Sequence, residues 1–97
     1  MDIGEFRASV TRAEPPEGLS PALLALWWDA KGDWKKAHQC AQEDRAVTGS
    51  AVHAYLHRKE PDLANARHWY SRAGRTEATG PLDTEWEELA VELLPHH

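Results

Sequence analysis

Residues 50–74 read SAVHAYLHRKEPDLANARHWYSRAG, and this stretch decides the fold. Apolar side chains recur at helical spacing on both sides of a central Glu-Pro-Asp, residues 60–62. The spacing predicts one helix over residues 51–59 and a second over residues 63–73. With so short a connection, the two helices are expected to pack against each other as a hairpin.

The residues around the turn suit their predicted places. Pro61 disfavours helical backbone angles at Glu60, so the first helix is expected to end there. Asp62 is a good N-cap for the second helix, because its carboxylate can accept a hydrogen bond from a free backbone N–H. Gly74 stands where glycine commonly terminates a helix.

An earlier pair of helices is predicted in the same way. Ser20 is an N-cap type and Pro21 is well placed as the first helical residue, where its missing N–H costs nothing. The helix over residues 22–30 is apolar nearly all round, which is typical of a buried helix. Asp33 then caps a helix over residues 34–44.

We divide the single domain into three parts. Residues 1–19 form an N-terminal helix and a proline-rich linker, residues 20–78 form the two hairpins, and residues 79–97 form a C-terminal acidic capping helix. That last helix, over residues 85–94, should begin with a capping box at Thr84. We expect it to cap one end of the hairpin pair and the N-terminal helix to pack at the other. Sustained period-two alternation is absent, so we predict an all-α domain of five or six helices.

The two hairpins superpose at an offset of 29 residues. Asp33 falls on Asp62, and Ala37 falls on Ala66. The first copy, GDWKKA at residues 32–37, resembles the glycine–aromatic–alanine signature of the tetratricopeptide (TPR) repeat. The further matched pairs are Ala22 with Ala51, Ala25 with Ala54, and Trp34 with Leu63.

The second copy resembles the family through Ala66, Tyr70 and Ala73, which fit its alanine and aromatic spacing. The resemblance covers residues 20–78 and implies hairpins stacked as a short TPR-like α–α superhelix. In that fold, small residues at the helix crossings let the backbones approach. The copies here are shorter than the family's roughly 34 residues, and Ala41 stands where an aromatic residue belongs.

In the second copy, two histidines replace the leucine and the aromatic residue of the repeat. Residues 53–74 also resemble a recurring segment of a small bacterial protein family, which implies a shared fold and no known activity. We therefore predict a non-catalytic helical-repeat protein that binds a protein or small ligand in a groove of the second hairpin. The expected binding residues are His53, His57, Arg58, His68 and Trp69.

An alternative is a small metal-binding or histidine-dependent enzyme. His53 and His57 are four residues apart, so both rings lie on one helix face and can share a divalent metal. A third ligand has to come from elsewhere in the chain. The opposing interpretation makes both rings polar members of a packing face, each hydrogen-bonded to a carbonyl or carboxylate. The candidate third ligands are His38, His68, Cys40, Asp33 and Asp62.

Other catalytic patterns are missing from the sequence. Cys40 and His38 are two residues apart on a predicted helix and point in different directions, so His38 is a poor base for the thiol. No glycine-rich phosphate loop, CxxC motif or Ser/His/Asp arrangement is present. We expect no cofactor and favour a binding protein over an enzyme. His96 and His97 close the sequence and are left out of the candidate ligands.

Charge and hydropathy limit the classes of partner that we expect. The net charge is −5, which disfavours nucleic acid, and no apolar run is long enough to cross a membrane. The start of the chain lacks a signal-peptide pattern, so we expect a cytoplasmic protein. Residues 31–75 carry net +4 and residues 76–97 net −6. These segments either pair with each other or leave a basic surface for an anion.

Two repeats bury less apolar surface than the three or more that such arrays prefer. A third hypothesis is therefore a structural homodimer. The expected packing tryptophans are Trp27, Trp28, Trp34 and Trp86.

Overall fold

The computed structural model describes residues 1–95 and, within them, contains six α-helices and no β-strand. The predicted all-α fold is therefore confirmed. Among the described helices, none is long and apolar enough to span a membrane. His96 and His97 lie outside the described residues. The helices are α1 (Ile3–Ser9), α2 (Pro21–Ala30), α3 (Trp34–Glu43), α4 (Val47–Lys59), α5 (Leu63–Arg72) and α6 (Leu82–Leu93).

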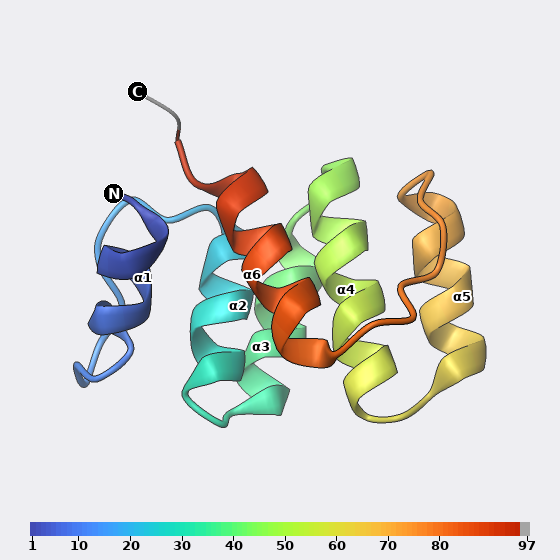
Figure 1. Cartoon of the computed structure of the whole chain (residues 1–97), viewed down its shortest axis with the longest axis horizontal. Helices are drawn as coiled ribbons and strands as arrows, with labels where there is room; N and C mark the ends of the chain where they lie inside the picture. Colours follow the sequence, from blue (N-terminus) through green and yellow to red (C-terminus); the bar gives the residue numbers. More distant parts are fainter. Residues whose placement is uncertain (96–97) are drawn as a thin grey trace.

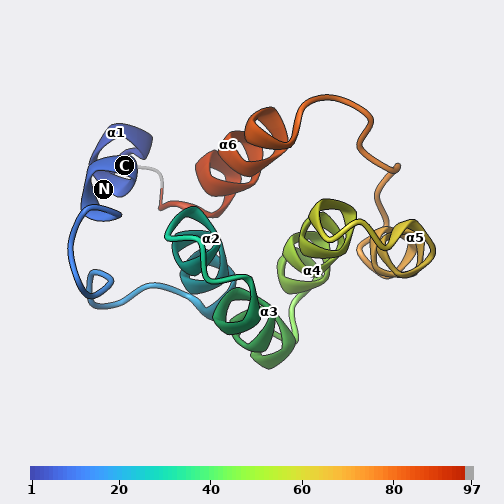
Figure 2. The ribbon, with the colours of Figure 1, turned by 90° about the horizontal axis from the view of Figure 1, so that it is seen from below.

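Four helices form the two predicted hairpins, α2 with α3 and α4 with α5, and Figures 1 and 2 show them in one row. Ser20 caps α2 by accepting a hydrogen bond from the Leu23 amide, and Pro21 is the first helical residue. Asp33 and Asp62 cap α3 and α5 through the amide three residues further on. The two caps share almost the same backbone angles, as the internal repeat predicts.

Small residues at the helix crossings keep the row tight. Ala37 and Ala66, the pair on which the repeat depends, are 0% and 2% exposed. Their buried methyl groups allow neighbouring backbones to approach closely. Of the tryptophans expected to pack, Trp27 and Trp86 are buried, and Trp28 and Trp34 are partly buried against the core.

Helix α4 begins at Val47 and not at residue 51 as predicted, so residues 48–50 are helical. Gly49 makes the earlier start possible. A Cβ at this position would lie 2.4 Å from the carbonyl oxygen of Asp44, so the first turn of α4 can approach the end of α3 only without a side chain. The glycine serves close packing here and does not mark a turn.

Helix α6 also begins before its predicted start, at Leu82. Pro81 is the N-cap residue, and its ring holds φ at −59°, close to the helical value. Because the helix is already under way, Thr84 lies in its first turn and no side chain caps the end. The predicted capping box at Thr84 is therefore wrong.

The acidic helix α6 packs across α2 and α4, and not at the outer end of the second hairpin as predicted (Figure 2). Trp86 anchors it, since the ring is 7% exposed and its indole N–H donates to the Leu26 carbonyl at 3.0 Å. Helix α1 joins the core beside it, with Phe6 stacked on Trp86. The α2–α4 face offers α6 an apolar surface for Trp86 and Leu89, whereas the outer side of α5 is mostly polar.

The uneven charge along the sequence is partly paired within the chain, since three of the nine basic residues in 31–75 pair with acids of residues 76–97. Glutamates of α6 meet arginines from three other parts of the molecule, which favours the first of the two interpretations of the charge pattern. The pairs are Arg7–Glu87 at 3.4 Å, Arg58–Glu85 at 2.9 Å, and Arg75–Glu92.

Candidate metal centre

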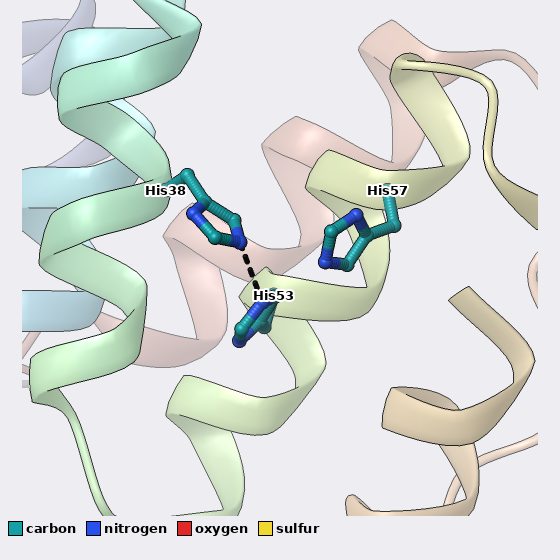
Figure 3. Close-up of side chains that lie close together, drawn as sticks. All are labelled: His38, His53 and His57. Carbon is teal, nitrogen blue, oxygen red and sulfur yellow. Dashed lines mark hydrogen bonds between the residues drawn. The ribbon is translucent and has the colours of Figure 1, made fainter. Parts of the chain in front are cut away.

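Three imidazoles meet where the first hairpin faces the second. His38 comes from α3, and His53 and His57 come from successive turns of α4 (Figure 3). One ring nitrogen from each lies within 4.8 Å of the other two. The Nε2 atoms of His38 and His53 are 2.9 Å apart and share a hydrogen bond. His53 and His57 are buried and His38 is half-buried.

The third ring is oriented by a carboxylate. The Nδ1 atom of His57 lies 3.0 Å from an Oε1 oxygen of Glu60, one helical turn later. A proton on Nδ1 leaves the Nε2 lone pair of His57 available to a ligand. Histidines that bind metals usually donate their second ring N–H to a carboxylate or carbonyl in this way. Glu60 therefore supplies the outer contact that such a histidine needs.

A second acidic group lies at the same turn. His57, Glu60 and Asp62 also place one ligand atom each within 4.8 Å of the others. Asp62, however, already accepts the Asn65 amide as the N-cap of α5. The His57 nitrogen that faces this group is the one bonded to Glu60. The three-imidazole group is the better candidate, because all of its ligands are nitrogen donors on helices.

Two indole rings hold the cluster from its sides. Trp34 stacks on His38 with centroids 4.9 Å apart, and Trp69 stacks on His53 at 3.9 Å. Trp34 is itself fixed, because its indole N–H donates to the Leu56 carbonyl at 2.8 Å. The imidazoles thus have little freedom to turn toward water, which is the kind of support that preorganises a ligand set.

Burial keeps two of the three imidazoles, those of His53 and His38, neutral. Burial, followed by the proximity of His38, His57 and His68, lowers the pKa of His53 to about 4. Burial and His57 also lower the pKa of His38, while Glu60 acts in the opposite direction. A neutral imidazole has a lone pair to donate, and a protonated one has none. At neutral pH these two rings are therefore in the form that binds metals.

The predicted binding residues lie in different surroundings. His53, His57 and Trp69 come together, whereas His68 is exposed and touches Trp69 with its edge, at 5.4 Å between centroids. Arg58 turns away toward α6, where it donates to a carboxylate oxygen of Glu85 at 2.9 Å and to the Gly80 carbonyl.

Among the five candidate third ligands, His38 is the one that joins both α4 histidines. Cys40, one half-turn further along α3, is partly buried, and burial raises the pKa of its thiol. Sequence reasoning missed the role of Glu60. Its position three residues after His57, on the last turn of the helix, was the available signal, because side chains at that spacing can touch.

No family model, curated protein or solved structure matches this chain. The resemblance to the tetratricopeptide repeat therefore stays a prediction from the sequence.

Proposed function

We propose that this protein binds a divalent transition-metal ion of the zinc type through His38, His53 and His57. The observation that supports this most directly is the convergence of three imidazole nitrogens from two helices within 4.8 Å. Three imidazole ligands suit zinc, copper, nickel and cobalt, whereas calcium and magnesium prefer oxygen. The ion would join the two hairpins at the contact between α3 and α4.

The spacing is compatible with a metal after small side-chain shifts. With Zn–N bonds of about 2.0–2.1 Å, two nitrogens of a tetrahedral site lie about 3.3 Å apart. The His38 and His53 nitrogens, at 2.9 Å, need to separate slightly. The widest spacing in the cluster, up to 4.8 Å, needs to shorten. An ion on the cluster would replace the hydrogen bond between His38 and His53.

Calorimetric titration of chelator-treated protein with Zn²⁺ tests the proposal. We expect one ion per chain, no binding of Mg²⁺ or Ca²⁺, and at least about 100-fold weaker binding after His38→Gln or His57→Gln. The matched control is His68→Gln, an exposed imidazole outside the cluster. Circular dichroism verifies that each variant remains helical. Unchanged zinc affinity in both cluster variants, or no stoichiometric zinc in the wild type, overturns the proposal.

Two further variants refine the assignment. Glu60→Gln keeps the size of the side chain but weakens its grip on His57, and we expect a 10- to 100-fold loss of zinc affinity. Glu43→Gln, which changes an exposed glutamate at the end of α3, should change nothing. A chain in which His96 and His97 are both alanine excludes zinc held by the terminal pair. It should retain the full stoichiometry.

Self-association is a second candidate function, and the exposed Leu63 at the start of α5 favours it. Among the described helices, α5 packs mainly against α4, and its Tyr70 also reaches α6 through a hydrogen bond to Glu85. Leu63 on α5 is 58% exposed, whereas Trp34, its counterpart in the first hairpin, is partly buried against the core. A second copy that covered Leu63 would supply the missing neighbour. Light scattering at two concentrations should show a dimer that Leu63→Ser dissociates, and a monomer at both concentrations would exclude this role.

A further inference from the structure

The opposite side of α4 carries a second group of polar side chains, separate from the histidines. Asp29, on the last turn of α2, is only 4% exposed. One of its carboxylate oxygens accepts the Tyr55 hydroxyl at 2.6 Å, and the other accepts the Lys59 ammonium at 2.9 Å. Tyr55 and Lys59 are one turn apart on α4. A carboxylate, a phenol and an amine therefore meet at one point between α2 and α4.

This group borders a cleft of about 430 Å³ between α1, α2, α4 and α6. Small-molecule sites in proteins typically fall between about 300 and 1,000 Å³ and combine apolar walls with a few fixed polar groups. The cleft falls in this size range, and its lining is about equally polar and apolar. Trp86 supplies an aromatic wall, and Val10 and Ala30 add smaller apolar surfaces.

Charges of both signs line the cleft. The Lys59 side chain is 41% exposed. Its ammonium has three N–H donors, and one of them is bonded to Asp29. The Arg7 guanidinium lies over the Trp86 ring, 5.2 Å from its centroid. Asp83, an exposed carboxylate of α6, lines the same cleft. A ligand of a single charge would be attracted by some of these groups and repelled by others.

The inner groups are held in fixed positions. Burial, and then the hydrogen bond to Asp29, raises the pKa of the Tyr55 hydroxyl, so the phenol remains a donor throughout the physiological range. Both oxygens of the Asp29 carboxylate already accept hydrogen bonds within the protein, one from Tyr55 and one from Lys59. Asp29 positions Lys59, and the charged groups that remain available to a ligand are Lys59, Arg7 and Asp83.

We propose that this cleft binds a small zwitterion of the α-amino acid type. Its carboxylate pairs with the Lys59 ammonium, its ammonium pairs with the Asp83 carboxylate, and its apolar side chain lies against Val10, Ala30 and the small exposed part of Trp86. The cleft lies between α1, α2, α4 and α6, and the histidine cluster lies where α4 faces α3 and α5. The inference is therefore independent of metal binding.

Three probes that differ by one charged group test the class of ligand. They are L-phenylalanine, 3-phenylpropionate, which lacks the ammonium, and 2-phenylethylamine, which lacks the carboxylate. Titrations of the full chain are followed by amide and indole shifts in two-dimensional NMR. We expect L-phenylalanine to shift the Trp86 indole signal and to bind at least about tenfold more tightly than either truncated probe.

Two variants assign the charges. Asp83→Asn changes an exposed side chain and should weaken the binding of L-phenylalanine and 2-phenylethylamine without weakening that of 3-phenylpropionate. Lys59→Met should weaken the two carboxylate probes and spare the amine. Lys36→Met, which changes a lysine stacked on Trp28 outside the cleft, is the matched control and should change none of them.

Several results overturn the proposal. One is that none of the three probes shifts signals from the cleft. Another is that 3-phenylpropionate or 2-phenylethylamine binds as tightly as L-phenylalanine, which would mean a simple anion or amine site. A third is that Asp83→Asn leaves the affinity for L-phenylalanine unchanged. The Asp83 test stands even if Lys59→Met unfolds the chain through loss of the Asp29 partner.

Discussion

Replacing Arg58 by methionine should destabilise the protein by about 3 kcal/mol, because it leaves a buried carboxylate without its partner. The guanidinium donates to a Glu85 carboxylate oxygen at 2.9 Å, and the two side chains are 15% and 10% exposed. The other Glu85 oxygen accepts the Tyr70 hydroxyl. Breaking a buried ion pair by removing one partner typically costs about 3–5 kcal/mol. We take the lower end, because the pair retains some exposure and methionine keeps most of the apolar stem.

The same chain contains a matched control. Arg67 and Glu77 form an ion pair of the same length, 2.9 Å, but their side chains are 68% and 49% exposed. Exposed pairs contribute about 0–1 kcal/mol, since water already solvates both charges. Arg67→Met should therefore cost less than about 1 kcal/mol. The two substitutions are chemically identical and differ in the burial of the carboxylate left behind and in the bond from Arg58 to the Gly80 carbonyl.

Urea unfolding, followed by circular dichroism at 222 nm with tryptophan fluorescence as a second probe, measures both effects. For a domain of this size the slope is roughly 1–1.5 kcal/mol per molar urea, so Arg58→Met should lower the midpoint by about 2 M. Adding Glu85→Gln to Arg58→Met should restore part of the loss, because the unpaired charge is then gone. Equal costs for the two single arginine variants, or a loss under about 1 kcal/mol for Arg58→Met, would refute the reasoning.

Three other perturbations follow from the packing and the charges. Gly49→Ala should lower the free energy of unfolding by about 2 kcal/mol, because its Cβ would collide with the Asp44 backbone, whereas Gly80→Ala, whose Cβ meets nothing within 4 Å, should change it little. Ala66→Leu should cost about 1–3 kcal/mol by overfilling the crossing of α4 and α5, as urea unfolding will show. With a chelator present, the His53 side chain resists protonation down to about pH 4 when folded, against 6.5 when unfolded. The contribution of His53 to the free energy of unfolding is thus complete above pH 6.5 and is lost as the pH falls toward 4, with about 2 kcal/mol lost by pH 5. Urea unfolding of a His53→Gln variant over the same pH range should lack this loss.

Local signals in the sequence predicted the hairpins well. The caps at Asp33 and Asp62 and the buried methyls of Ala37 and Ala66 all depend on residues near in sequence to the elements they fix. Helix caps and small residues at helix crossings depend on a few neighbouring residues, so sequence patterns predict them.

The early starts of α4 and α6 were less visible. Glycine at residue 49 and proline at residue 81 act through backbone geometry that depends on what lies nearby. The same residue types also form turns, and only the tertiary neighbours distinguish the two uses.

The position of α6 was out of reach for a different reason. The helix has an apolar stripe that two surfaces could cover, the end of the second hairpin or the face of α2 and α4. The sequence of the helix alone does not show which of these two surfaces is the more apolar. Trp86 meets Phe6, from the other end of the chain, and the Leu26 carbonyl, 60 residues away. Contacts this distant cannot be inferred from periodicity, which reports only on a helix and its own faces.

Both candidate sites follow from the burial of α4. Every residue of α4 from Ala51 to His57 is buried, because α2, α3, α5 and α6 all pack against this helix. A helix enclosed in this way has no solvent face on which to place its polar side chains. Each of them must therefore find a hydrogen-bond partner within the protein, as buried polar groups generally do.

The partners follow from that constraint. His53 meets His38 of α3, Tyr55 meets Asp29 of α2, and the Arg58 guanidinium meets α6. Polar residues that cost free energy in an all-round buried helix thus become three separate contacts, and two of them border the metal centre and the cleft proposed above. Since His53 and Tyr55 are two residues apart, about 200° around the helix, their sites must lie on opposite sides of α4. The chemistry that this small domain can perform is therefore arranged around a single helix.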